Sequence, residues 1–188
     1  MTPAQRKLIS RYRSGNLSDE EFVAAFGVDP RQDRDFVPSQ LRNAIASQVP
    51  RDLRYAMYLA FLFDLSRSWA PLLAQLLEEE WHTSHEDLAS ALQDIRDPST
   101  VEALFCTARK RLRYLAYDDA FALAVKCIWA LHDIGTDAAI QKLELLTSSE
   151  VPPIRAAAKE RLAALAARRP EDPVPRYRLA RDARVRST

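Results

Sequence analysis

The chain has 188 residues, which is enough for one domain, or one domain with an appendage, to bury a core without disulfide or metal support. Its 29 alanines and 24 leucines outnumber its 9 valines and 7 isoleucines more than threefold, and only 3 glycines occur. Because strands favour β-branched residues and their turns favour glycine, these counts exclude a sheet protein and predict an all-α fold. Two cysteines exclude a disulfide framework, and a net charge of +1 argues against a dedicated nucleic-acid domain.

The sequence predicts a cytoplasmic protein that carries no cofactor. Its first ten residues contain no apolar run of the kind found in signal peptides, and its longest apolar stretch, residues 53–65, is too short to cross a bilayer. The glycines, at positions 15, 27 and 135, are too far apart to form a phosphate-binding loop.

Charge is distributed unevenly along the chain. Residues 77–150 carry seven basic and fourteen acidic side chains, whereas residues 151–188 carry ten and four. Seven of these basic side chains are arginines of the segment 168–188, which also contains prolines and few apolar groups. We expect this segment to be a disordered basic tail, with a contact arm for an acidic partner as the alternative.

The N-terminal part is predicted to be a helical hairpin followed by a linker. Pro3 begins a short helix, and Ser18 with Glu21 forms the pattern of a capping box that begins a second one. Residues 27–38 contain Asp-Pro and alternating arginine and aspartate, which is typical of a loop. These features predict one domain over residues 1–37 and a second, helical domain over residues 38–167.

Repetition is the most informative feature of the second domain. The run ALQDI at 91–95 aligns with ALHDI at 130–134 at an offset of 39, and a second alignment holds at an offset of 34. Such periods are a solenoid signature. They predict short helices at 98–108 and 137–146, capped by Asp97 and Thr136, alternating with longer helices at 117–134 and 152–167.

The runs ALQDIRDPSTVEAL, ALHDIGTDAAIQKL and VPPIRAAAKERLAAL resemble HEAT repeats of the short bacterial kind over residues 84–167. This resemblance implies an α-solenoid of helix pairs. It also implies an interaction scaffold, since most HEAT proteins have that role, and a minority of relatives handle chromophores or damaged nucleic acid.

In such a stack the second helix of each pair lines the concave face, which here selects the helices 84–95, 117–134 and 151–167. Helical periodicity then predicts which side chains face the groove. These side chains are mostly acidic, with one indole at the centre of the groove. Because tryptophan is enriched among interface hot spots and carboxylates select cations, this groove favours a basic protein partner. The predicted partner-binding residues are Asp87, Ser90, Asp94, Asp119, Lys126, Trp129, Asp133 and Glu160.

Small HEAT-like proteins resemble immunity proteins and adaptors, so a non-catalytic module that neutralises a basic toxin is the favoured function. For Trp129 the competing interpretation is a side chain wedged between repeats. The alternative function is that of a HEAT-like lyase or DNA glycosylase relative, in which aromatic side chains would stack a flat ligand or nucleic acid.

No catalytic or metal-binding residues are predicted. His82 and His85 match no zinc-binding spacing, and the adjacent Ser84 is a good helix cap. Cys106 and Cys127 lie on apolar helix faces without a local activating group. The basic, tyrosine-containing insertion at 109–117 suits phosphate contacts, but cations at a helix end also stabilise the helix dipole, so nucleic acid is not the expected partner.

Overall fold

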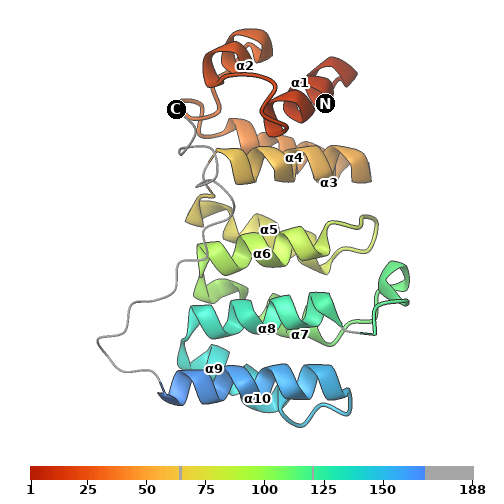
Figure 1. Ribbon diagram of the computed structural model, residues 1–188, viewed down its shortest axis with the longest axis vertical. Helices are drawn as coiled ribbons and strands as arrows, with labels where there is room; N and C mark the ends of the chain where they lie inside the picture. The colour runs from red at the N-terminus through yellow and green to blue at the C-terminus, as the bar shows by residue number, and fades with distance from the viewer. Residues whose placement is uncertain (64, 120, 168–188) are drawn as a thin grey trace. The chain divides into compact units, whose positions relative to one another are not determined.

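The computed structural model describes residues 1–63, 65–119 and 121–167, and every regular element in these ranges is helical (Figure 1). The prediction of an all-α fold is therefore confirmed. Within the same ranges, no helix combines the length and the apolar character needed to cross a membrane. The basic tail expected at 168–188 lies outside the described residues.

The chain packs as two units, of which the first comprises Met1–Leu65 and Trp81–Ser84. Its hairpin is present, and the predicted capping box is confirmed because the Ser18 hydroxyl accepts from the Glu21 amide while the Glu21 carboxylate accepts from the Ser18 amide. The helices of this unit are α1 (Pro3–Arg13), α2 (Asp19–Phe26), α3 (Phe36–Ser47) and α4 (Pro50–Leu62).

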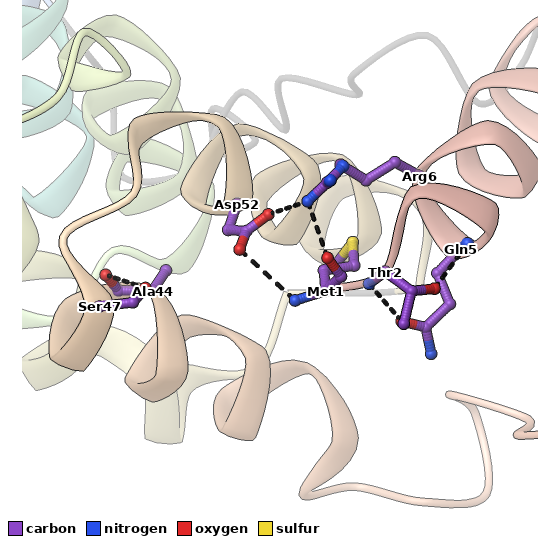
Figure 2. Close-up of polar contacts among 7 residues, drawn as sticks. All are labelled: Met1, Thr2, Gln5, Arg6, Ala44, Ser47 and Asp52. Atoms are coloured by element: carbon purple, nitrogen blue, oxygen red, sulfur yellow. Dashed lines mark hydrogen bonds and ion pairs between the residues drawn. The ribbon is translucent and has the colours of Figure 1, made fainter.

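The boundary expected near residue 38 lies inside this first unit. The apolar face of the hairpin is partly buried by Phe63 at the end of α4. The Phe63 ring stacks on those of Tyr12 and Phe22, with 5.8 Å and 5.6 Å between the ring centroids. Figure 2 shows a polar link between the same helices, in which the Arg6 guanidinium donates to the Asp52 carboxylate at 2.6 Å. The hairpin is thus packed on α4 and is not a separate body.

The second unit comprises, among the described residues, Ser66–Glu80 and the chain from His85 to Ala167. Its helices pack as two adjacent rows, with α6, α8 and α10 in one and α5, α7 and α9 in the other (Figure 1). The elements are the 3₁₀ turns Arg67–Trp69, Pro98–Thr100 and Arg113–Leu115 and the helices α5 (Ala70–Glu78), α6 (His85–Ile95), α7 (Val101–Ala108), α8 (Ala122–Ile134), α9 (Asp137–Leu146) and α10 (Pro152–Ala167).

The predicted caps in the second unit are confirmed. The Asp97 carboxylate accepts from the Ser99 amide at 2.9 Å, and the Thr136 hydroxyl accepts from the Ala139 amide at 3.3 Å. The core of this unit includes fully buried leucine and isoleucine side chains, among them Leu88, Leu92, Leu104, Ile128, Leu131 and Leu143.

The helix expected over 117–134 begins later, at Ala122. The Asp118 carboxylate accepts a 2.7 Å hydrogen bond from the Ala122 amide, and Phe121 adopts the left-handed conformation with φ of 56°. A left-handed residue interrupts a right-handed helix, so the residues before it belong to a loop. This correction moves Tyr117 and Asp119 from the predicted helix into the connection between α7 and α8.

Candidate functional site

Most of the predicted partner-binding residues come from α6, α8 and α10, the three helices of one row. We use the term three-helix face for the polar and aromatic side chains that these helices bring together. They are Glu86, Ser90, Gln93 and Asp94 of α6, Lys126, Trp129, His132 and Asp133 of α8, and Glu160 and Arg161 of α10.

The first connection across this face joins α6 to α8 near their N-terminal halves. The Lys126 ammonium lies 3.3 Å from the Glu86 carboxylate and 3.5 Å from the Ser90 hydroxyl. Ser90 in turn donates to the Glu86 carbonyl at 2.9 Å. Both charged side chains are about one third exposed, at 38% and 37%, so this pair contributes little to stability in water.

The second connection centres on Asp133, whose side chain is only 4% exposed. One carboxylate oxygen accepts from the Gln93 amide at 2.8 Å and the other lies 2.8 Å from His132 Nδ1. Burial alone would raise the pKa of Asp133, but the hydrogen bonds from His132 and Gln93 hold that pKa below its ordinary value. Asp133 is therefore a satisfied, ionised carboxylate that ties α8 to α6.

Asp94 has the opposite character. Burial raises its pKa from 3.8 to about 6, against the favourable charge of Arg96 and with further repulsion from Asp133. Within the described residues the Asp94 side chain forms no hydrogen bond or ion pair. The two carboxylates thus lie near each other on adjacent helices, and only that of Asp133 has polar partners there.

Trp129 lies one helical turn before Asp133 and is partly exposed, so it is not sealed inside the core. The Arg161 guanidinium of α10 lies over its ring at 5.3 Å from the centroid, and Arg161 also pairs with Glu160. The indole therefore contacts the neighbouring helix with one face while part of its surface reaches solvent. This arrangement combines features of both interpretations offered by the sequence.

Two predicted residues are not joined to this cluster. Asp87 lies in the first turn of α6, where its charge contributes to the raised pKa of the Tyr114 phenol. Asp119 is exposed in the loop that precedes α8. Its assignment to the face followed from the helix expected over 117–134, and the late start of α8 removes that basis.

The expectation of a mainly acidic groove included the cation Lys126 but not Arg161. These two cations each pair with a carboxylate of the face, so two of its four carboxylates are compensated by cations within it. Four members of the face were not predicted from the sequence: Glu86, Gln93, His132 and Arg161. Glu86 and Gln93 lie one turn from the predicted Ser90 and on its side of α6, which is the signal that would have found them.

A second polar region occupies the connection between α7 and α8. We call residues 109–119 the basic loop, because it holds Arg109, Lys110, Arg111 and Arg113. The Tyr114 hydroxyl lies 3.0 Å from His85 Nδ1, and the Lys110 ammonium donates to the Glu78 carbonyl at 2.7 Å. Burial raises the pKa of Tyr114 to about 12, so it stays protonated and holds this loop against α6.

The histidines near the start of α6 have structural partners. His85 is fully buried, with its Nε2 atom 2.6 Å from the Glu79 carbonyl and Nδ1 facing Tyr114. His82 Nδ1 accepts from the Ser84 amide at 3.2 Å. In the described part of the chain, no three histidine, cysteine or acidic side chains are grouped as a metal site would require.

Comparison of the chain with known protein families, with curated proteins and with solved structures finds no match. The function of this protein must therefore be inferred from the geometry of the three-helix face and of the basic loop.

Proposed function

We propose that the second unit is an α-solenoid of HEAT-like helix pairs and that its three-helix face binds another protein without catalysing a reaction. The observation that carries this proposal is a partly exposed tryptophan of α8, covered on one face by Arg161 of α10, together with an α6 carboxylate, Asp94, that has no partner in the described residues. Asp94, Trp129 and Asp133, predicted from the repeat offsets, all belong to this arrangement.

Trp129 has the properties of an interface anchor. Tryptophan, tyrosine and arginine are enriched at positions where truncation costs more than about 2 kcal/mol of binding. The Arg161 guanidinium over the indole fixes the orientation of that ring, so little rotamer entropy is lost when a partner covers it. A rigid aromatic surface with its polar neighbours already paired favours a protein surface over a small molecule.

Asp94 favours a basic partner. A carboxylate with a raised pKa gains most when a cation approaches, because the cation restores the charged form that burial disfavours. A lysine or arginine of the partner placed beside Asp94 would also relieve its repulsion from Asp133. Neutralisation of a basic toxin, such as a nuclease, fits this chemistry and would place the protein in the cytoplasm.

The proposal is tested by affinity purification from the native cell with the wild type and three variants. We expect the wild type and Lys159→Ala to retain the same basic protein, and Trp129→Ala and Asp94→Ala to lose most of it. Lys159 is exposed on α10 and is the control for a changed surface residue. A captured toxin would then be co-expressed with each form, and protection should follow retention.

Thermal unfolding of Trp129→Ala accompanies this experiment. A melting temperature within a few degrees of the wild type, together with loss of the partner, supports the binding role. Collapse of the fold would assign Trp129 to the core. Equal retention by all forms, or no retained protein and no protection, would overturn the proposal.

A further inference from the structure

The basic loop joins α7 to α8 (Figure 1), and its three arginines differ from several other cations of the second unit in their partners. Within the described residues, the side chains of Arg109, Arg111 and Arg113 form no ion pair or hydrogen bond. Other cations of the same unit do have carboxylate partners, among them Arg67, Lys126, Lys142 and Arg161. The basic loop therefore concentrates positive charge that the described structure leaves uncompensated.

Two of these arginines, Arg111 and Arg113, line a pocket of about 200 Å³. The apolar part of its lining, called its floor below, includes the buried side chains of Leu112, Leu123 and Ala124. Lys110, Arg111 and Arg113 contribute to its lining, and Asp118 is the one carboxylate among the described residues that line it. Asp118 already accepts a hydrogen bond from the Ala122 amide, which reduces its competition for the neighbouring guanidinium groups.

The pocket is held in shape by contacts on several sides. Tyr114 is anchored to His85 of α6, and Lys110 is anchored to the end of α5 through the Glu78 carbonyl. The Arg111 guanidinium lies 4.0 Å above the centroid of the Phe121 ring. A guanidinium stacked in this way keeps its N–H groups in its own plane, where they remain available to oxygen atoms of a ligand.

We propose that this pocket binds a nucleotide, with Arg111 and Arg113 holding the phosphate and the apolar floor receiving the ring. Cations alone would suit any anion, but cations and apolar side chains that line the same pocket suit a ligand that joins a flat ring to a phosphate. Tyr117, which is 82% exposed on the same loop, offers a stacking surface for a further base. This inference does not depend on the protein-binding role proposed above.

The test is a calorimetric titration of the full chain at 50 mM salt with adenosine 5′-monophosphate, adenosine, inorganic phosphate and a ten-residue single-stranded oligonucleotide. The monophosphate should bind at least about tenfold more tightly than adenosine or phosphate alone, because each lacks one half of the recognised group. A strand that binds more tightly than the monophosphate, with affinity falling steeply at 200 mM salt, identifies the source as nucleic acid. If the strand binds equally to or more weakly than the monophosphate, the ligand is identified as a free nucleotide.

Arg111→Ala and Arg113→Ala should each weaken the binding by about tenfold or more, because each removes a charge-assisted hydrogen bond to phosphate. Arg11→Ala is the matched control, since Arg11 is an exposed arginine of α1. Circular dichroism would show that each variant keeps its helices. Failure of both phosphorylated ligands to bind, phosphate binding as tightly as the monophosphate, or unchanged affinity in both loop variants would overturn the proposal.

Discussion

The three-helix face and the basic loop belong to the same unit, yet they use charge in opposite ways. On the three-helix face, Lys126 pairs with Glu86, and Asp133 is held by Gln93 and His132. In the basic loop, Arg111 stacks on a ring and is balanced by no carboxylate among the described residues. Polar groups in the first region connect helices, whereas in the second Tyr114 and Lys110 anchor the loop and the guanidinium groups of Arg111 and Arg113 remain available to a ligand.

This difference shows why charge counting along a sequence is a poor guide to a binding surface. The acidic segment 77–150 contains the α6 and α8 parts of the three-helix face, but most carboxylates of this face have partners on it. What remains for recognition is Asp94 and the exposed part of Trp129. Polar side chains that hold the fold have partners within the protein, whereas those open to a ligand do not. Mutation of the first kind should therefore change stability, and mutation of the second kind should change binding.

The largest effect on stability is expected from Asp133→Ala. It removes a buried acceptor and leaves the Gln93 amide and the His132 ring without their bonds, which should lower the free energy of unfolding by about 1–3 kcal/mol at pH 7. Because the folded pKa of Asp133 is depressed, its contribution is present above the ordinary value of about 3.9 and is lost as pH falls further. Urea unfolding at pH 7 and pH 3 checks both statements. If the wild type and Asp133→Ala differed in unfolding free energy by the same amount at both pH values, the proposed dependence of stability on the ionisation of Asp133 would be contradicted.

A smaller effect of opposite sign is expected from Asp94→Asn. The folded protein holds a proton on Asp94 more tightly than the unfolded chain, so the raised pKa of this group makes stability fall as pH rises from 3.8 to about 6. Removing the charge should stabilise the protein at pH 7 by about 1 kcal/mol, a value reduced because the carboxyl is partly exposed and screened by solvent. Thermal unfolding should show a rise of about 2–4 °C at pH 7 and none at pH 4. Destabilisation at pH 7 would mean that Asp94 already has a partner.

The ion pair of Lys126 with Glu86 should contribute still less to the free energy of unfolding. A double-mutant cycle with Lys126→Ala and Glu86→Ala is expected to give a coupling energy of about 0.5 kcal/mol, because both side chains are over a third exposed. The coupling should diminish in 1 M salt, where exposed charges are screened. A coupling above about 2 kcal/mol would show that this pair fixes the helices as Asp133 does.

The smallest effect on stability is expected in the basic loop. Arg113→Ala should change the free energy of unfolding by no more than about 0.5 kcal/mol, because the side chain is exposed and has no ion-pair partner in the described residues. Urea unfolding measures this directly. A larger loss would place Arg113 among the groups that hold the fold and would remove the contrast between the two regions.

Local signals in the sequence were sufficient for much of the fold. Thr136 caps α9 as predicted, and α9 and α10 have the bounds that the repeat offsets indicated. The predicted start of α8 was wrong because a left-handed Phe121 has no sequence signal, since glycine or asparagine normally marks that conformation. The contacts of the hairpin with Phe63 also escaped prediction, because they join residues far apart in the chain.

The candidate site was predictable only in part. Helical periodicity placed Ser90 and Asp94 on α6 and Lys126, Trp129 and Asp133 on α8. Among these residues, the structure joins Lys126 to Ser90 and brings Asp94 near Asp133. Which charges are paired across helices depends on side-chain geometry that periodicity does not contain. The pairing of Lys126 with Glu86 and the cover of Trp129 by Arg161 therefore required the structure.

Recognition of a basic protein by the three-helix face is tested most sharply by the affinity of the captured partner between pH 5 and pH 7.5. For the wild type we predict affinity that rises by several-fold across this range, because Asp94, with a pKa of about 6, becomes charged beside the partner's cation. Asp94→Asn should remove that rise while Lys159→Ala keeps it. An identical pH profile for the wild type and Asp94→Asn would contradict this mode of recognition.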